Sequence, residues 1–163
     1  MKEQIRQMSE IKIRPATPED LPTLLRFEQG VINAERVFDK LIKPDPVFYY
    51  DIKEMISAAH IEILVAEVDG QVVGSGYARI ETAKHFLKHP KHAYLGFMYV
   101  DPAHRGRGIN SKIIEVLKEW AISQEISELR LDVYEGNLPA IKAYEKVGFN
   151  KQLINMHMEI GED

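Results

Sequence analysis

The sequence predicts one α/β (α+β) domain built on a mixed β-sheet, and three patterns support this. A nearly continuous apolar run at residues 61–68 is followed by Asp69-Gly70 and a second strand pattern, which is typical of a β-hairpin. Strand, helix and strand patterns then follow one another over residues 94–134, which implies a right-handed parallel crossover. Helical patterns stand both before and after the hairpin. We therefore expect an antiparallel N-terminal part, a later parallel pair and helices on both faces of the sheet.

Composition indicates an ordinary globular protein. Its 163 residues are 45% apolar and 28% charged, so we expect a polar tail at residues 1–10 and a single domain at 11–163. The net charge of −4 argues against a nucleic-acid or anionic-membrane partner. The absence of cysteine excludes disulfides, thiolate metal sites and a cysteine nucleophile. No apolar run approaches the roughly 18 residues of a membrane span, and the polar start has no signal-peptide core, so we expect a cytoplasmic location.

The first elements are predicted from local signals. Residues 11–15 alternate between apolar and polar like a short strand. A capping threonine followed by a proline and two acids at residues 17–20 predicts a helix that continues to about residue 35. Prolines and mixed charges interrupt the pattern, so residues 37–47 are predicted to form a loop. A second helix is predicted over residues 47–59.

The middle of the chain predicts the rest of the hairpin. Its second strand covers residues 71–80, where Gly74 and Gly76 indicate a bulge or a close backbone approach. A polar connection follows at residues 82–91. Three histidines in this region are interpreted as solvated loop side chains: His85, His89 and His92. No carboxylate lies nearby at ligand spacing, so no metal is expected.

The most informative stretch joins a strand predicted at residues 94–100 to a helix that starts near Gly108. The helix has one apolar face, formed by Ile109, Ile113, Leu117 and Trp120. Gly106 and Gly108 permit a tight turn and a close backbone approach, while Arg105 and Arg107 add positive charge. A helix start also offers unpaired N–H groups and a positive dipole end. The stretch therefore predicts a phosphate or pyrophosphate cradle, with a plain strand-to-helix turn as the alternative.

This loop resembles one family signature and fails two others. It lacks the Walker A run, and Ser111 stands where the dinucleotide fingerprint needs its third glycine. The stretch from Arg105 to Asn110 instead resembles the Arg/Gln-x-x-Gly-x-Gly/Ala signature of the GCN5-related N-acetyltransferase (GNAT) superfamily. It departs from that signature at Asn110, which replaces a small residue. Asparagine tolerates left-handed backbone angles, so we expect the loop shape to be kept.

A second stretch, from Asn137 to Phe149, resembles the other signature of the same superfamily, Asn-x-x-Ala-x-x-x-Tyr-x-x-x-Gly-Phe. Its local chemistry predicts a helix, because Asn137 can cap it, Pro139 lies in its first turn and Gly148 suits a left-handed stop. The two signatures occur in the family's order. Apolar and polar residues alternate at residues 154–160, where we expect a last strand, so the resemblance covers nearly the whole chain.

The resemblance implies the GNAT fold, in which a parallel strand pair is splayed around the site of the co-substrate acetyl-CoA. It implies that acetyl-CoA contacts one strand end, the loop and two helices, at Met98, Tyr99, Val100, Arg105, Gly106, Arg107, Gly108, Ile109, Asn110, Ser111, Asn137 and Tyr144. Tyr144 is also the implied general acid, because a phenol is protonated at neutral pH and can donate to a thiolate. Asp132 is interpreted either as a base acting through water or as a structural acid. Other candidate bases are Tyr99, Glu81, His92 and Glu67.

We therefore predict an acetyl-CoA-dependent N-acetyltransferase that acts by direct attack of a primary amine in a ternary complex. The acceptor is expected to be a small-molecule or peptide amine, and a homodimer is expected from the family. The aromatic run at residues 48–50 is interpreted either as core packing or as a wall of the acceptor pocket. The main alternative function is an acyl-CoA-binding sensor on the same fold without turnover. An unrelated nucleotide-binding domain is disfavoured because both nucleotide fingerprints fail.

Overall fold

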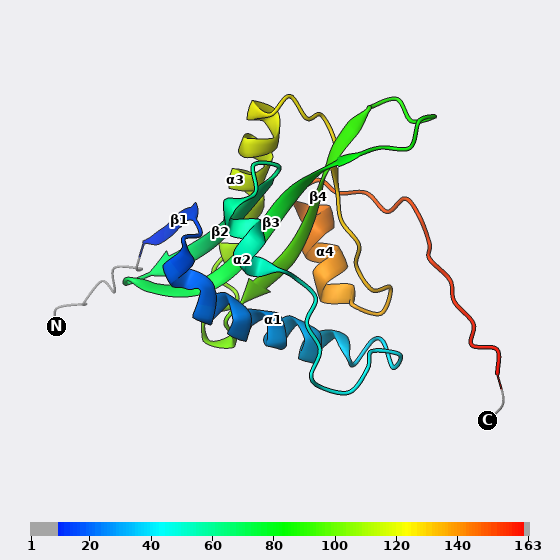
Figure 1. The fold of residues 1–163 in the computed structure, drawn as a ribbon, viewed down its shortest axis with the longest axis horizontal. Coiled ribbons are helices and arrows are strands. Elements are labelled where there is room, and N and C mark those ends of the chain that lie inside the picture. The colour runs from blue at the N-terminus through cyan, green and yellow to red at the C-terminus, as the bar shows by residue number, and fades with distance from the viewer. Residues whose placement is uncertain (1–9, 162–163) are drawn as a thin grey trace, which may run out of the picture. The chain divides into compact units, whose positions relative to one another are not determined.

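A five-stranded sheet organises the first of two units of the structure (Figure 1). Its strands are β1 (Ile11–Pro15), β2 (Ile61–Val68), β3 (Gln71–Thr82), β4 (Lys91–Val100) and β5 (Leu129–Arg130), and they are neighbours in that order. The first three pairings are antiparallel, whereas β4 and β5 are parallel. The mixed sheet predicted from the sequence is therefore confirmed.

This structure is a computed structural model that describes residues 10–161. The first of its two compact units ends at Asp132, and the second begins at Val133. The tail predicted at residues 1–10 lies, except for its last residue, outside the described range.

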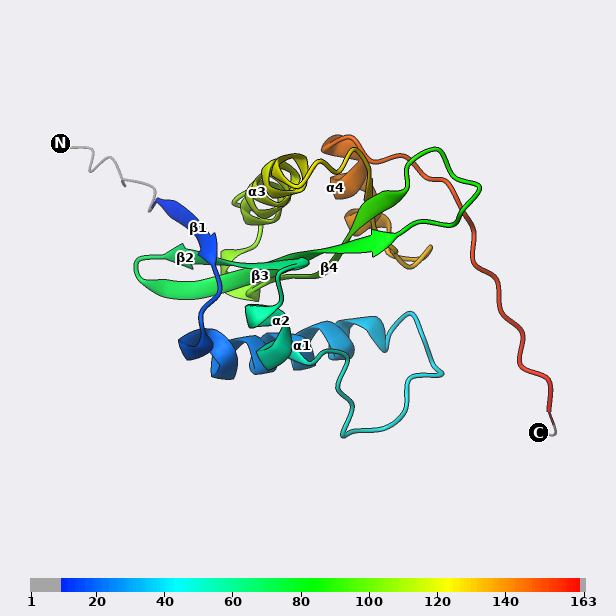
Figure 2. The ribbon, with the colours of Figure 1, turned by 45° about the horizontal axis from the view of Figure 1, so that its top comes forward.

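Helices cover both faces of the sheet in the first unit (Figure 2). Helices α1 (Leu21–Glu35) and α2 (Ile52–Ser57) lie on one face, and α3 (Ile109–Ser123) lies on the other. Short 3-10 turns precede α1 at Pro18–Asp20 and α3 at Pro102–His104. The core on the α1 side consists of buried side chains from helices, strands and the turn after β1, namely Ala16, Leu24, Phe27, Ile52, Met55, Ile63, Val65, Tyr77 and Phe97.

Helix α2 is shorter than the sequence predicted, because it begins at Ile52 instead of residue 47. The backbone N–H groups of Tyr49 and Tyr50 donate to the Glu28 carboxylate, at 2.9 and 2.8 Å, and not to a helical carbonyl. This contact keeps the segment before α2 out of the helix. Asp51 is the N-cap of the helix, and its carboxylate accepts from the Glu54 N–H at 3.2 Å.

The predicted hairpin is confirmed and runs further than expected. Asp69 and Gly70 both have positive φ, 52° and 77°, as a two-residue turn between β2 and β3 requires. Strands β3 and β4 both continue into the predicted connection, and their pairing ends with Thr82 opposite Lys91. The interpretation of His92 as a solvated loop residue is therefore wrong: its side chain is 12% exposed, and its Nε2 lies 3.1 Å from Glu81 on β3.

Strand β5 is shorter than predicted, with two residues in place of the run at 129–134. Within the predicted run, Leu129 and Arg130 alone pair with β4, opposite Ala93 and Tyr94. An alternating pattern forms a strand only where a neighbour supplies backbone partners, and the pairing with β4 ends after these two residues.

The second unit contains helix α4 (Leu138–Lys146). The Asn137 side chain caps it by accepting from the Ala140 N–H at 3.4 Å, and Gly148 has φ 114° just beyond its end, as predicted. The predicted last strand is wrong, because residues 150–160 form no helix or strand. Their apolar side chains are exposed, and no described strand offers them a backbone partner.

Candidate active site

The predicted anion loop lies between β4 and α3. Gly106 has φ 80° and Gly108 has φ 75°, so both adopt the left-handed conformation that favours glycine. A Cβ atom added to either glycine would meet no atom within 4 Å. The glycines are therefore required by the backbone conformation and leave open space beside the loop.

Positive charge and N–H donors accompany this loop. Gly108 is the N-cap of α3 and supplies no side-chain hydrogen bond, so the first amides of the helix keep their donor capacity. Arg105 and Arg107 are exposed, and the Arg105 Nε donates to the Val100 carbonyl at 3.2 Å, which ties its guanidinium to the end of β4. Left-handed glycines, a helix start and two guanidinium groups together fit a phosphate or pyrophosphate.

Strand β4 is distorted just before the loop. Phe97 has φ 55°, and the pairing between β3 and β4 shifts register between Ser75 and Tyr77. The buried Ser75 hydroxyl donates to the Phe97 carbonyl at 3.0 Å, which holds the distortion in place. Bulges of this kind change the direction of strands beside active sites. The roles of Phe97 and Ser75 were not predicted from the sequence, although Gly74 and Gly76 in β3 stand on either side of Ser75.

The two residues after the distortion point to different faces. A Cβ on Gly76 would lie 2.7 Å from the Met98 sulfur, so Met98 lies on the α3 side. The Tyr99 ring lies against α1, 4.7 Å from the Phe27 ring between centroids. One short stretch of β4 thus places side chains on both faces of the sheet, Met98 on the α3 face and Tyr99 on the α1 face.

One edge of β4 lacks a strand partner beside this point. Among described residues, none forms a strand pair with Leu95 to Val100 on the β5 side, because the parallel pairing ends at Tyr94. The parallel pairing therefore ends before the strand residues that the resemblance implies for acetyl-CoA. Unpaired N–H and C=O groups along a strand edge can bind an extended ligand by strand addition.

Asp132 lies at the end of the first unit and is bound by Tyr94, whose hydroxyl donates to its Oδ2 at 3.1 Å. Burial, together with the charge of Asp132, raises the pKa of Tyr94, so this phenol remains a hydrogen-bond donor at neutral pH. Glu67 and Glu81, two other candidate bases, each bind a guanidinium: Glu67 accepts from Arg14 at 2.8 Å, and Glu81 accepts from an arginine of its own strand at 2.7 Å.

The remaining predicted site residues belong to the second unit. Asn137 precedes α4 and caps it, and Tyr144 lies on that helix. The Tyr144 ring contacts the Phe149 ring edge-on, with centroids 5.9 Å apart. The structure therefore gathers the loop residues and the strand end in one unit, and Asn137 and Tyr144 on one helix of the other.

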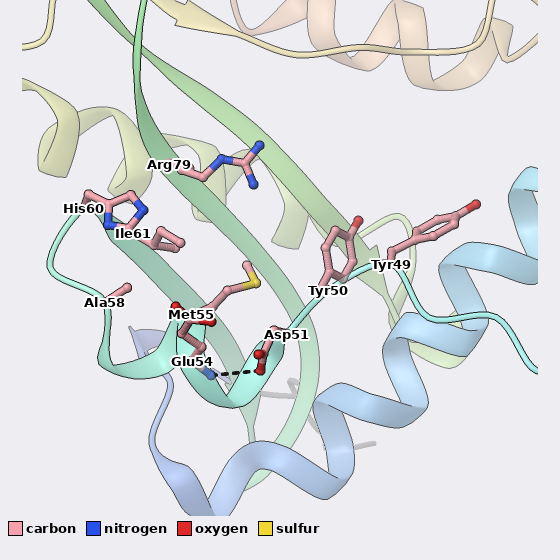
Figure 3. A pocket seen from close by; sticks show the side chains of 9 residues that line it. All are labelled: Tyr49, Tyr50, Asp51, Glu54, Met55, Ala58, His60, Ile61 and Arg79. Atoms are coloured by element: carbon pink, nitrogen blue, oxygen red, sulfur yellow. Dashed lines mark hydrogen bonds between the residues drawn. The ribbon is translucent and has the colours of Figure 1, made fainter.

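A pocket of about 280 Å³ opens on the α1 and α2 face of the sheet (Figure 3). It is lined by Tyr49, Tyr50, Asp51, Glu54, Met55, Ala58, His60, Ile61 and Arg79. Tyr50 also packs on Phe97, so of the aromatic run at residues 48–50 Tyr49 and Tyr50 form a pocket wall, Tyr50 also packs on the core, and Phe48 is exposed. The other lining residues could not be identified from the sequence, because they come from α2, β2, β3 and the segments between them and share no local motif.

Among residues 10–161, none of the helices combines the length and the apolar character of a membrane span. Over the same range, no group of three potential metal-ligating side chains comes together.

The known proteins to which this chain is similar are named as acetyltransferases. A model of the acetyltransferase (GNAT) family matches residues 30–149. The chain is 30% identical over 155 residues to thialysine N-epsilon-acetyltransferase of Bos taurus, covering 86% of this chain and 85% of that protein. It is 28% identical over 148 residues to the L-amino acid N-acetyltransferase AaaT of Escherichia coli strain K12, covering 87% and 84%. A predicted acetyltransferase of Clostridium acetobutylicum, solved with acetyl-CoA, has a TM-score of 0.67 at 19% identity, over 92% of this chain and 96% of that chain.

Proposed function

The chain belongs to the acetyltransferase (GNAT) family, and we propose that it transfers the acetyl group of acetyl-CoA to the nitrogen of a primary amine. The amine nitrogen attacks the thioester carbon directly. A C–N bond forms, the C–S bond breaks, the nitrogen loses a proton and CoA leaves as its thiol. Catalysis then requires residues that hold the co-substrate, remove the ammonium proton and stabilise the leaving thiolate.

The observation that carries the proposal is the loop between β4 and α3. Two left-handed glycines with open space beside them, an uncapped helix start and two guanidinium groups suit the pyrophosphate of acetyl-CoA. We assign this contact to residues 105–111. The end of the parallel pairing at Tyr94 supports a second contact, in which backbone groups of Met98 and Val100 bind the pantetheine amides, with Tyr99 beside them.

We assign the proton transfers to Asp132 and Tyr144. Asp132 accepts the ammonium proton through a water molecule, and the hydroxyl of Tyr94 orients its carboxylate. Tyr144 donates a proton to the leaving thiolate, since a phenol is protonated at neutral pH. Asn137 contributes a hydrogen bond to the pantetheine in addition to capping α4. The names of the relatives, which specify thialysine and L-amino acids, support a small amine as the acceptor.

A thermal melt tests the proposal. A ligand at about 100 times its dissociation constant stabilises the folded state by roughly 2.7 kcal/mol, which raises the midpoint by several degrees in a chain of this size. We expect a rise with acetyl-CoA and with CoA, and none with ATP or NAD. The same protein should release thiol from acetyl-CoA only when an amine is present. No rise with either CoA species would contradict the proposal, and a rise without thiol release from any amine would favour the sensor.

A further inference from the structure

A ladder of paired side chains crosses β3 and β4 on the face that carries α1. Three pairs stand directly opposite one another: Tyr77 with Gly96, Arg79 with Tyr94, and Glu81 with His92. Alternate residues of a strand point to the same face, and Tyr77 belongs to the core on the α1 side, so all three pairs lie on that face. Polar and charged side chains therefore continue the aromatic core along the two strands.

Glu81 is bound at both of its carboxylate oxygens. Its Oε2 accepts from the Nε and Nη2 of Arg79, at 2.9 and 2.7 Å, and its Oε1 lies 3.1 Å from the Nε2 of His92. The Nδ1 of His92 is buried and has no hydrogen-bond partner among residues 10–161. A hydrogen on that nitrogen would be a buried donor without an acceptor, so the pattern favours a hydrogen on Nε2, which donates to Glu81. Arg79 and His92 thus fix the carboxylate from two sides.

Glu81 in turn fixes the guanidinium of Arg79. The guanidinium carbon lies 5.6 Å from the ring centroid of Tyr94 and 5.5 Å from that of Tyr77. A cation over the face of an aromatic ring is attracted to it, and the contact opposes rotation of the ring. The hydroxyl of the Tyr94 ring donates to the Oδ2 of Asp132 at 3.1 Å. A change at Glu81 can therefore reach Asp132 through two intervening side chains.

Asp132 depends on such support, because the strand that leads to it ends early. It lies two residues beyond the end of β5 and is exposed. An exposed side chain outside regular structure exchanges between rotamers, and a hydrogen bond from a fixed donor favours one of them. A general base must lie within hydrogen-bond reach of its proton or of one bridging water. The orientation of this carboxylate therefore affects the rate of proton transfer.

We propose that Glu81, held by His92, is a positioning residue for the acetyl transfer. It keeps Arg79 against the Tyr94 ring. Tyr94 thereby holds the Asp132 carboxylate in the orientation that receives the ammonium proton through water. This inference rests on the proposed function, in which Asp132 is the base. In this role Glu81 exchanges no proton with the substrate.

Two substitutions of Glu81 test this role, since Glu81 is 32% exposed and does not line the pocket. Both remove the same charge, but Glu81→Gln keeps an acceptor oxygen for Arg79 and Glu81→Ala does not. Acetylation by the full chain is measured with L-lysine, benzylamine or spermidine, whichever the parent acetylates fastest. Glu81→Ala should lower kcat roughly fivefold or more and change KM less than about twofold, and Glu81→Gln should recover part of the loss. Equal losses, an unaltered kcat, or a change in KM alone would overturn the proposal.

Glu128→Ala is the matched control for Glu81→Ala. The Oε1 of Glu128 accepts from the Nε of Arg130 at 3.1 Å, with the same two-residue spacing, and its side chain is 31% exposed. The substitution therefore removes a similar carboxylate from a similar arginine and leaves the contact between Arg79 and Tyr94 in place. We expect kcat to stay at the parent value. A loss as large as that of Glu81→Ala would overturn the proposal.

The pH dependence of kcat separates positioning from a simple effect of charge. A carboxylate that loses a hydrogen bond binds its proton more readily, so the acidic limb should move to higher pH in Glu81→Ala. Loss of a nearby negative charge alone would move the limb to lower pH. The titratable or charged side chains that face Tyr94, besides the base, are Tyr50, Tyr77, Arg79 and Glu81. A limb that moves to lower pH, or does not move, would overturn the proposal.

Tyr94→Phe removes the hydroxyl through which Glu81 is proposed to act. This variant should lower kcat at least as much as Glu81→Ala does. In the double variant, Glu81→Ala should then have no further effect, because the route to Asp132 is already broken. Losses that multiply in the double variant would show that Glu81 acts by another route, and would overturn the proposal.

Acetyl-CoA affinity and thiol release, measured on the same samples, separate this inference from the proposed function. If acetyl-CoA does not bind, or binds while none of the three amines is acetylated, the proposed transfer fails and this inference falls with it. If amines are acetylated and Tyr94→Phe lowers kcat while Glu81→Ala does not, the positioning role alone fails and the proposed function stands.

Discussion

The two faces of the sheet are held by different kinds of contact. On the α3 face, buried apolar side chains of the helix meet glycines of β3, and no charged residue within the described range is buried there. On the α1 face, two carboxylates are buried with the apolar core, Asp20 at 7% exposure and Glu28 at 0%. One helix is therefore attached by close packing, and the other by packing together with charged hydrogen bonds.

The same difference appears in the two features of the candidate site. The anion loop leads directly into α3, so close packing against β3 fixes the start of that helix. The pocket is bounded in part by Tyr49 and Tyr50, in a segment without regular structure that α1 holds through hydrogen bonds. The loop is built from residues adjacent in the chain, whereas the pocket depends on contacts between distant segments.

The largest effect is expected from Glu28→Leu on the α1 face. The substitution leaves the N–H groups of Tyr49 and Tyr50 without their acceptor, and each unpaired buried group costs about 1–3 kcal/mol. Part of that cost is offset, because the buried Glu28 Oε1 has no partner within the described chain. We expect the free energy of unfolding in urea to fall by about 3 kcal/mol. Glu28→Gln keeps an acceptor oxygen and is the control, and an equal loss in both variants would contradict this account.

A smaller loss is expected from Gly76→Ala on the α3 face. The added Cβ would lie 2.7 Å from the Met98 sulfur and 2.8 Å from the Ile113 Cγ2, so side chains must move. Overpacking of this kind costs about 1–3 kcal/mol, and the flexible methionine favours the middle of that range. Gly161→Ala adds a Cβ with no atom within 4 Å and should leave the unfolding midpoint unchanged. A stable Gly76→Ala would show that α3 does not need this close approach.

The contacts on the α3 face were easier to predict from the sequence than those on the α1 face, and the reason is physical. Gly74 and Gly76 interrupt an apolar strand, so the sequence predicted a bulge or a close backbone approach there, although not on which face; the structure has a register shift at this point and a close approach of α3. Glu28 lies within an ordinary helical pattern, and its partners are more than 20 residues away in the chain, so nothing local predicts its burial.

The same contrast applies to the candidate site. The loop at residues 105–111 was predicted because glycines, arginines and a helix start stand together in the sequence. The distortion at Phe97 depends on a hydrogen bond from Ser75 on the neighbouring strand, which no spacing reveals. The last strand was predicted from alternation at residues 154–160, but alternation does not supply the neighbour that a strand needs.

The smallest effect on stability concerns the carboxylate at the start of α1. Asp20 binds both terminal nitrogens of Arg14, at 2.8 and 2.9 Å, and this hydrogen bonding lowers the pKa of Asp20 below its usual value near 4. Because the unfolded chain binds this proton more readily, the stabilisation is complete above the unfolded pKa and is lost as pH falls through the lower folded pKa.

We therefore expect Asp20→Asn to lower the free energy of unfolding by about 1–2 kcal/mol at pH 7, and the gap to its parent to narrow below pH 4. Glu119→Gln, an exposed carboxylate on α3, is the control and should follow its parent at every pH. A constant gap between Asp20→Asn and its parent from pH 7 to pH 2 would contradict the role given to this ion pair.

We propose that the loop between β4 and α3 binds the phosphates of acetyl-CoA, and two glycines allow a matched test of this contact by isothermal titration calorimetry. Gly108 and Gly70 have nearly the same conformation, φ 75° and 77°, and a Cβ on either would meet no atom within 4 Å. Gly108→Val and Gly70→Val should therefore carry similar backbone strain, about 1–2 kcal/mol. We predict that Gly108→Val lowers acetyl-CoA affinity at least tenfold and that Gly70→Val leaves it unchanged. Equal affinity in the two variants would contradict the assignment of the loop.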